Sequence, residues 1–435
     1  MKNYRRTVAL PVAALLLASC SAAEEDPSAE ASANGGGSEV ATDVGVTQEP
    51  CVGREDSGKG CIYLGQISDM TVGPFASLAV PATDAIVAFW ERVNDEDIIQ
   101  GYDVDVETFL RDNQYNPELH FNAYLEMRDE VLAIAQTLGS PTTAAIMEEL
   151  VADGVVAAPL SWTSANWFSE QILPSASNYC FEAMNNYDYL LDRLGEEARI
   201  GVLHYAGDYG DDGAGGARAA AEFREGHISD IPTEPGPDNQ GGAVSAMLRE
   251  ELDAVILFVA PGDALEIIGE TTSRGFDGLF VGAWPTWDSG NLESPLLEVL
   301  EEQYLQSGYL APFGTSTPGH DALYEAVGDV TPNDGYVAGW SFQYPLLETL
   351  QVAVARGDLT RGGVAAAITE LESVDYEGML PDDAGNFAAQ SPNEGATRAT
   401  LIRRVDRDAP FGLAVEEEFF VGPSAAAYSF EEPCF

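Results

Sequence analysis

Short apolar runs alternate along the chain with longer segments whose apolar residues recur every three or four positions. The run CIYLGQI at residues 61–67 predicts a short buried strand. A helix is predicted next, with Pro81 in its first turn, where proline is best tolerated. Its buried face, at the i, i+3, i+4, i+7 spacing, carries Ile86, Phe89, Trp90 and Val93.

The alternation continues for most of the chain. Strand-like runs recur at residues 102–109, 154–160, 198–205, 254–260, 279–284 and 309–314. Helical segments separate the later ones, including one at 296–308. Strands joined by helices of this length predict an α/β fold with parallel sheets and right-handed crossovers. Because the strands are too many for one open sheet, we expect two Rossmann-like lobes, with ligands at the carboxyl ends of the strands.

The first twenty residues have the layout of an export signal. MKNYRR is basic, TVALPVAALLLAS is apolar but too short to span a bilayer, and Cys20 follows directly. LASC, residues 17–20, resembles the bacterial lipobox, which implies a lipoprotein signal peptide at 1–20 and lipidation of Cys20. The alternative is an ordinary secretion signal that is cut nearby. Residues 21–58 are predicted to be a flexible acidic tether.

The charge is strongly negative, with a formal value of −52 and 72 acidic against 20 basic residues. Such a surface repels nucleic acid and anionic lipid and favours solubility. Because the acids are spread along the chain, we interpret most of them as solvated surface and the excess as a sign of a saline habitat.

Four cysteines remain after Cys20, and an exported protein meets an oxidising environment. The prediction is therefore two disulfides among Cys51, Cys61, Cys180 and Cys434, with three connectivities possible. Their spacing does not match zinc sites, and the four histidines are scattered singly, so no metal and no cofactor is expected.

Several segments in order resemble the branched-chain amino-acid-binding proteins of ABC importers. They begin at IYLGQISDMTVGPFASLAV, include GSPTT, VVAAPLSWTSAN and RIGVLHYAGDYGDDGAGG, and end near residue 405. The resemblance implies a type I periplasmic binding fold, in which two lobes joined by a three-strand hinge close over a small molecule. The implied first lobe is 59–183 with 313–377, and the second is 184–312 with 378–435. The crossovers are placed near 181–185, 311–314 and 376–380, with a Cys180–Cys434 disulfide beside them.

Two turns of the implied first lobe match turns that hold ligand in this family. GSPTT nominates Ser140, Thr142 and Thr143, because hydroxyls and backbone N–H groups at a helix start suit an anion. The alternative for any one of them is a helix cap. LSWTS points in the same way to Ser161 and Thr163, with Trp162 as a wall of the cleft or as a structural core residue.

The glycine-rich stretch at 202–216 is not a phosphate-binding loop. It has no lysine at the phosphate position and carries three aspartates where a phosphate needs positive potential. Calcium is disfavoured because the spacing departs from the EF-hand pattern. The match to the family instead implies that Tyr209 in GDYG closes over the ligand. Tyr336 is a further candidate near the cleft.

The sequence departs from the pattern of the family it resembles at Trp284, in FVGAWPTW. Family members that bind amino acids have an acid at about this position, which pairs with the ligand ammonium. An aromatic face holds a cation more weakly than an acid does. Asp263 or Asp288 could substitute. The departure favours a short amide, urea, a larger amino-acid derivative or an aromatic compound over a standard α-amino acid.

Together these features predict a lipid-anchored solute-binding protein of an ABC importer on the extracytoplasmic face of the cell membrane. Its expected partners are a small amino-acid-like or amide ligand, an ABC permease and the membrane through the anchor, with no nucleic acid. The alternative is an extracellular ligand sensor working with a separate signalling partner. An enzyme is not expected, because the chain has no G-x-S-x-G nucleophile motif.

Overall fold

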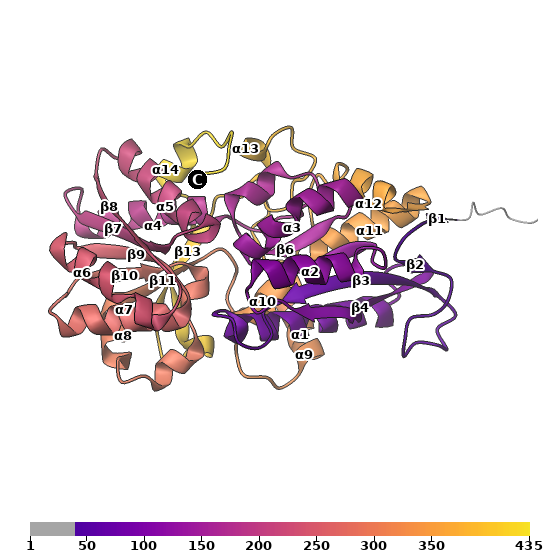
Figure 1. Ribbon diagram of the computed structural model, residues 1–435, viewed down its shortest axis with the longest axis horizontal. Coiled ribbons are helices and arrows are strands. Elements are labelled where there is room, and N and C mark those ends of the chain that lie inside the picture. The colour runs from indigo at the N-terminus through magenta and orange to yellow at the C-terminus, as the bar shows by residue number, and fades with distance from the viewer. Residues whose placement is uncertain (1–39) are drawn as a thin grey trace, which may run out of the picture. The chain divides into compact units, whose positions relative to one another are not determined.

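The computed structural model describes residues 40–435 (Figure 1). The predicted signal peptide, the lipidation of Cys20 and residues 21–39 of the predicted tether lie outside the described residues. The tether prediction is wrong for residues 40–58, which contain two short paired strands, Ala41–Thr42 and Val46–Thr47, and the disulfide-bonded Cys51. Within residues 40–435, no helix is both long and apolar enough to cross a membrane.

One sheet is built by the N-terminal half of the described chain. Its strands run in the order β2 (Val46–Thr47), β3 (Gly60–Ser68), β5 (Ala133–Leu138) and β6 (Ala157–Leu160), and β4 (Tyr102–Asp112) also pairs with β3. All of these pairings are parallel except that of β2 with β3. Helices α1 (Ala76–Asp95), α2 (Pro117–Met127) and α3 (Ser140–Asp153) connect the successive strands β3, β4, β5 and β6, since parallel strands need a crossover connection. We call this part the first lobe.

A second sheet of seven strands forms the second lobe (Figure 1). Its order is β14 (Leu413–Phe420), β13 (Thr400–Val405), β11 (Tyr304–Gly308), β10 (Leu279–Gly282), β9 (Ala254–Phe258), β7 (Arg199–Tyr205) and β8 (His227–Thr233). In this sheet β13 pairs antiparallel with both of its neighbours, β11 and β14, and the other pairings are parallel. Its helices are α4 (Tyr179–Leu194), α5 (Asp208–Phe223), α6 (Gly241–Arg249), α7 (Pro261–Ser273) and α8 (Leu297–Gln303).

The chain returns to the first lobe after β11. This segment contains α9 (Pro318–Val327), α10 (Asp334–Ser341), α11 (Tyr344–Arg356) and α12 (Arg361–Ile368), and α10 packs closely on α1. Strand β12 (Asp358–Leu359) pairs with β1 (Ala41–Thr42). Two short helices, α13 (Pro392–Gly395) and α14 (Pro423–Ala427), belong to the C-terminal segment. The predicted α/β class with parallel sheets is confirmed, whereas the exact lobe boundaries stay a prediction.

The position of Pro81 was predicted wrongly. Helix α1 begins at Ala76, so Pro81 lies inside it rather than in its first turn. Proline has no N–H to offer the carbonyl four residues earlier. That carbonyl, of Ser77, instead accepts a hydrogen bond of 3.0 Å from the Asn333 side chain, which precedes α10. A contact from a distant segment therefore compensates for a proline that local rules place elsewhere.

Two further predictions need correction. The strand expected at 309–314 is irregular, and the strand of that region is β11, whose buried Gln306 and Ser307 interrupt the apolar pattern. The predicted crossovers are not strands: residues 181–185 lie inside α4, while 311–314 and 376–380 have no regular structure.

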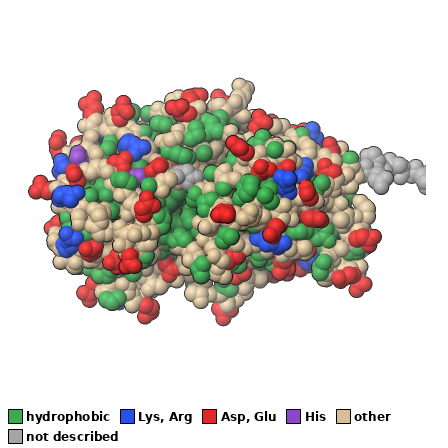
Figure 2. Space-filling view, in the orientation of Figure 1, with side chains coloured by type: hydrophobic (Ala, Val, Ile, Leu, Met, Phe, Trp, Pro, Cys, Tyr) green, Lys and Arg blue, Asp and Glu red, His purple; other side chains and the backbone are tan. Residues whose placement is uncertain are grey.

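The disulfides join Cys51 to Cys61 and Cys180 to Cys434, which selects one of the three connectivities. The second disulfide fixes the C-terminus to the start of α4. Acidic side chains are scattered over the visible face rather than gathered in one patch, as Figure 2 shows. This distribution agrees with their interpretation as solvated surface.

Candidate ligand-binding cleft

A cavity lies where the carboxyl ends of strands from the two sheets meet. The first lobe contributes the turns after β5 and β6 and the first turns of α1, and the second contributes the starts of α4 and α5 and the turn after β10. The lining residues are Phe75, Leu78, Ala79, Ala82, Tyr115, Leu138, Gly139, Ser140, Leu160, Trp162, Tyr179, Tyr209, Trp284 and Pro285. This is the position at which α/β folds bind ligands.

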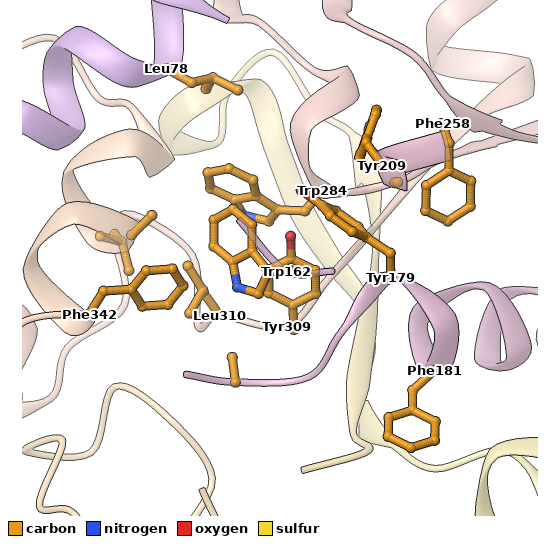
Figure 3. Close-up of a cluster of buried hydrophobic side chains, with 14 of the residues drawn as sticks. Leu78, Trp162, Tyr179, Phe181, Tyr209, Phe258, Trp284, Tyr309, Leu310 and Phe342 are labelled. Atoms are coloured by element: carbon orange, nitrogen blue, oxygen red, sulfur yellow. The ribbon is translucent and has the colours of Figure 1, made fainter. Parts of the chain in front are cut away.

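Aromatic side chains from both lobes meet in this cavity (Figure 3). Trp162 follows β6 and Trp284 follows β10, and their ring centroids are 4.8 Å apart. Phe75, just before α1, packs edge-on against Tyr209 of α5 at 5.9 Å. These distances are typical of favourable aromatic pairs. The aromatic rings therefore hold the two lobes together at the cleft.

The cavity is small in this arrangement, with a volume of about 40 Å³. A cavity needs roughly 10–15 Å³ of such space to hold one water molecule, so there is room for only a few atoms. A larger ligand requires the lobes to separate or the aromatic side chains to move.

Of the side chains that the structure describes, none that lines the cavity is charged. Asp263 is buried elsewhere, where it accepts hydrogen bonds from Tyr205 Oη (2.5 Å) and Gly236 N (2.8 Å). Asp288 caps a short helix by accepting from Gly290 N at 2.7 Å. Neither of these acids takes the place of the missing ammonium partner. Within residues 40–435, no group of three or more His, Cys, Asp or Glu residues is arranged to hold a metal ion.

Two of the helix ends at the cavity already have acidic partners. Asp69 accepts hydrogen bonds from Gly73 N (2.9 Å) and Phe75 N (3.1 Å) just before α1. At the start of α5, Asp211 accepts from Gly207 N at 3.1 Å. Because carboxylates of the protein already accept hydrogen bonds at the positive N-terminal ends of these helices, the two helix ends attract a ligand anion less strongly.

Asp212 of α5 joins the two lobes through Ser164. It is fully buried and accepts hydrogen bonds from Ser164 N (2.8 Å) and from Ser164 Oγ. Ser164 lies just after β6, in the first lobe. The Ser164 hydroxyl also accepts from Cys434 N at 3.0 Å, so the C-terminus reaches the same junction.

Polar atoms without partners occur in the wall of the cavity. Trp162 and Tyr209 are each only 4% exposed, and within residues 40–435 neither Trp162 Nε1 nor Tyr209 Oη has a hydrogen-bond partner. Burial raises the pKa of the Tyr209 hydroxyl well above its ordinary value, as it does for Tyr179, so both hydroxyls keep their protons. A buried donor without a partner is costly, and a bound ligand is one way to satisfy it.

Four of the predicted site residues come together here, namely Ser140, Trp162, Tyr209 and Trp284. Ser161 lies directly behind them, with its Oγ 2.6 Å from Ser140 Oγ.

The other nominated residues do not line the cavity. Thr142 donates back to Gly139 O at 2.9 Å, and Thr143 is 2.9 Å from Thr137 Oγ1, so both hydroxyls have local partners. Thr163 is buried with its hydroxyl unpartnered within the described residues, and Tyr336 packs near Phe313.

No pattern in the sequence marks Phe75, Leu78, Tyr115 and Tyr179 as lining residues of the cavity. Phe75 and Leu78 fall within the segment that carried the family resemblance, but an apolar residue before or inside a helix has the pattern of ordinary core. Only the packing of the lobes distinguishes them.

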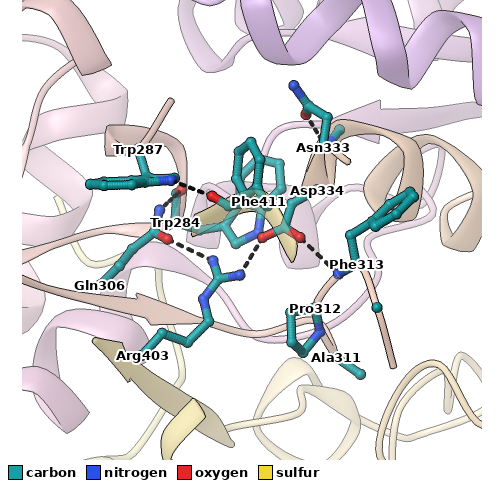
Figure 4. A network of polar contacts seen from close by, with 12 residues as sticks. Trp284, Trp287, Gln306, Ala311, Pro312, Phe313, Asn333, Asp334, Arg403 and Phe411 are labelled. Atoms are coloured by element: carbon teal, nitrogen blue, oxygen red, sulfur yellow. Dashed lines mark hydrogen bonds and ion pairs between the residues drawn. The ribbon is translucent and has the colours of Figure 1, made fainter. Parts of the chain in front are cut away.

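A buried polar network holds the backbone of Trp284 (Figure 4). Its backbone N donates to Glu182 Oε1 at 2.8 Å, and its backbone O accepts from Gln306 Nε2. Gln306 in turn accepts from Arg403 Nη2 at 2.7 Å, and Arg403 pairs with Asp334. Burial raises the pKa of Glu182 to about 8. Side chains from α4, β11, β13 and α10 thus fix the turn that carries Trp284.

The sequence matches the family described as "Periplasmic binding protein" over residues 62–410. No match is found among curated protein sequences.

Similar solved structures include a fatty acid ABC transporter substrate-binding protein from Thermomonospora curvata, with a TM-score of 0.80 and 26% identity, covering 89% of this chain and 97% of that chain. A branched-chain amino acid ABC transporter protein from Thermus thermophilus with bound valine has a TM-score of 0.71 and 15% identity, covering 84% and 98%. A leucine-binding protein from Thermotoga maritima has a TM-score of 0.68 and 16% identity, covering 83% and 99%. The last two share the fold alone.

Proposed function

The chain belongs to the periplasmic binding protein family, and we propose that it is the lipid-anchored binding component of an ABC importer for a ligand that is mostly apolar. The observation that carries this proposal is the cavity between the lobes, lined by aromatic and aliphatic side chains from both. We propose Ser140, Trp162, Tyr209 and Trp284 as ligand contacts, with Phe75 and Leu78 added to them.

The chemistry of the lining favours an acyl chain or an aromatic ring. Each methylene group moved from water to such a surface contributes about 0.8 kcal/mol. The similar structure from Thermomonospora curvata is named as a substrate-binding protein for fatty acids. At 26% identity this name is a guide to the class of ligand, and it agrees with the apolar character of the cavity.

A standard α-amino acid fits this lining poorly, although it was the ligand suggested by the family resemblance. Its ammonium group needs an acid, and a buried charge without a partner costs several kcal/mol. Asp69, Glu182 and Asp212 are buried acids on the elements around the cavity, and each accepts hydrogen bonds from the protein. An amide or a derivative that masks the ammonium stays compatible with the site.

Binding is proposed to work by hinge closure. Trp162 and Trp284 approach each other from different lobes, so a ligand between them contacts both lobes only when these are closed. A ligand shifts the balance between open and closed states by its difference in affinity for the two. The closed form is then what a permease recognises.

A thermal-shift screen tests the proposed function. The full chain carrying Cys20→Ser is heated with leucine, short amides, aromatic acids, octanoic acid and octanamide. A ligand at a hundred times its dissociation constant stabilises the folded state by about 2.7 kcal/mol. We expect stabilisation by the apolar compounds and none by leucine, with the ligand recovered unaltered by mass spectrometry. Stabilisation by leucine alone would contradict the proposed ligand class, and consumption of the compound would indicate an enzyme.

The anchor and location form a separate part of the proposal. The basic and apolar segments followed by Cys20 support lipidation and attachment to the extracytoplasmic face of the membrane. Fractionation of cells that express the wild-type chain and Cys20→Ser tests it. The wild-type chain is expected in the membrane fraction and the variant in the soluble fraction, whereas the same distribution for both would refute the anchor. A sensor with a separate signalling partner is the alternative if no permease associates.

A further inference from the structure

We propose that the cleft selects a ligand whose polar head is uncharged, so that a carboxylic acid is bound in its protonated form. This inference rests on the proposed function, since it concerns the head group of the same mostly apolar ligand. Two observations carry it. The cavity wall offers only neutral hydrogen-bonding groups among the described side chains, and buried acids lie on the elements around the cavity.

The polar groups in the wall are all neutral among the described side chains. They are the Ser140 hydroxyl, the Trp162 indole N–H and the hydroxyls of Tyr115, Tyr179 and Tyr209. Trp162 Nε1 and Tyr209 Oη have no partner within residues 40–435, so they are donors that a carbonyl oxygen can satisfy. A neutral hydrogen bond of this kind contributes about fivefold in affinity.

A ligand carboxylate finds no cationic partner in this cavity. No Lys or Arg side chain lines the cavity among the residues described, and a desolvated carboxylate without a cation is strongly disfavoured. Three buried acids lie on the surrounding elements, namely Asp69 before α1, Glu182 on α4 and Asp212 on α5, and Asp211 lies in the first turn of α5. The buried cation behind Trp284, Arg403, is already paired with Asp334 and donates to Gln306. Asp69 and Asp211 already accept from the N–H groups at the starts of α1 and α5.

The other two helix ends at the cavity, those of α3 and α4, are weakened anion sites. At α4 the side chain of Asn178 already accepts from Phe181 N at 3.0 Å. Pro141 in the first turn of α3 has no N–H to donate. The Ser140 hydroxyl is already 2.6 Å from that of Ser161. A formal charge of −52 for the whole chain further opposes the approach of an anion.

The test compares three probes with the same alkyl chain: octanamide, octanoic acid and octylammonium. Affinities for the full chain carrying Cys20→Ser are measured at pH 6 and pH 8. We expect octanamide to bind equally at both pH values and octylammonium to bind more weakly than octanamide. The pKa of octanoic acid is near that of a glutamate side chain, about 4.3. Above this value the protonated fraction of the acid falls tenfold per pH unit, so we expect its apparent affinity to fall about a hundredfold from pH 6 to pH 8.

Glu182 also titrates in this range, and the octanamide series controls for it, since its ionisation would affect both ligands. Octanoic acid binding that is unchanged from pH 6 to pH 8, or tighter binding of octylammonium than of octanamide, would overturn the inference. Failure of all three probes to bind would overturn the proposed ligand class and the inference with it.

A variant pair tests the neutral donors directly. Tyr209→Phe keeps the ring and removes the unpartnered hydroxyl, and it should weaken octanamide binding about fivefold. The matched control is Tyr63→Phe, on β3 and away from the cavity, which should leave the affinity unchanged. Equal affinities for the wild type and Tyr209→Phe would exclude Tyr209 from head-group recognition.

Discussion

Arg403 of β13 and Asp334 at the start of α10 form a buried ion pair that joins the two lobes. Their side chains are 1% and 2% exposed. Asp334 Oδ1 also accepts from Phe313 N at 2.8 Å, in the segment through which the chain returns to the first lobe. The pair therefore links the sheet of the second lobe to a helix that packs on α1 of the first, close to the turn that carries Trp284 (Figure 4).

Replacing Arg403 tests the importance of this pair. Arg403→Met leaves Asp334 buried without its cation, and such changes cost about 3–5 kcal/mol. Urea unfolding measures the loss. The control is Arg407→Met, which removes an exposed pair with Glu301 at 2.6 Å and should leave the free energy of unfolding nearly unchanged. Similar losses for the two variants would show that the buried pair has no special role.

The two disulfides should differ in their contribution to stability. Cys180–Cys434 spans 254 residues and Cys51–Cys61 spans 10. In the chain-entropy description their removal costs about 5 and about 3 kcal/mol, respectively. Thermal unfolding of Cys180→Ala/Cys434→Ala and of Cys51→Ala/Cys61→Ala compares them. A larger loss for the short loop would indicate that strain or local contacts outweigh loop length.

Glu182 should make stability fall as the pH rises. Its pKa is raised by burial to about 8 in the folded chain and lies near 4.3 when unfolded, so the folded state holds one more proton between these values. Stability then decreases with rising pH across that window, by at most about 1.4 kcal/mol per pH unit.

The variant Glu182→Gln cannot ionise and keeps an oxygen to accept from Trp284 N. Urea unfolding at pH 6 and pH 8 should show a smaller decrease for this variant than for the wild type. Parallel decreases for the two would show that Glu182 is ionised throughout this range.

Trp284 should contribute to affinity through its ring. Trp284→Ala removes one face of the aromatic pair with Trp162, and we expect octanamide to bind at least about tenfold more weakly. Trp167→Ala is the matched control, because Trp167 follows the same strand as Trp162 but does not line the cavity. Fluorescence titration measures both, and a loss that is equal in the two variants would point to a general effect on the fold.

Local patterns predicted most of the fold, and part of the site. Clear apolar periodicity marks strand β3 and helix α1, and two of the segments singled out in the sequence supply lining residues: GDYG, at the start of α5, supplies Tyr209, and LSWTS supplies Trp162. Pro81 and β11 were misplaced because Asn333 and the buried network around Gln306 override the local pattern. The uncharged character of the cavity depends on which side chains the two lobes bring together, as with Phe75 and Tyr209, and this information lies in long-range packing.

The most direct test of the central claim is a calorimetric titration of the Cys20→Ser chain with octanamide and with leucine under the same conditions. An aromatic and aliphatic cleft without a charged partner predicts saturable 1:1 binding of octanamide, with a negative heat-capacity change from apolar burial, and no measurable heat of binding for leucine. Tighter binding of leucine than of octanamide would contradict the account.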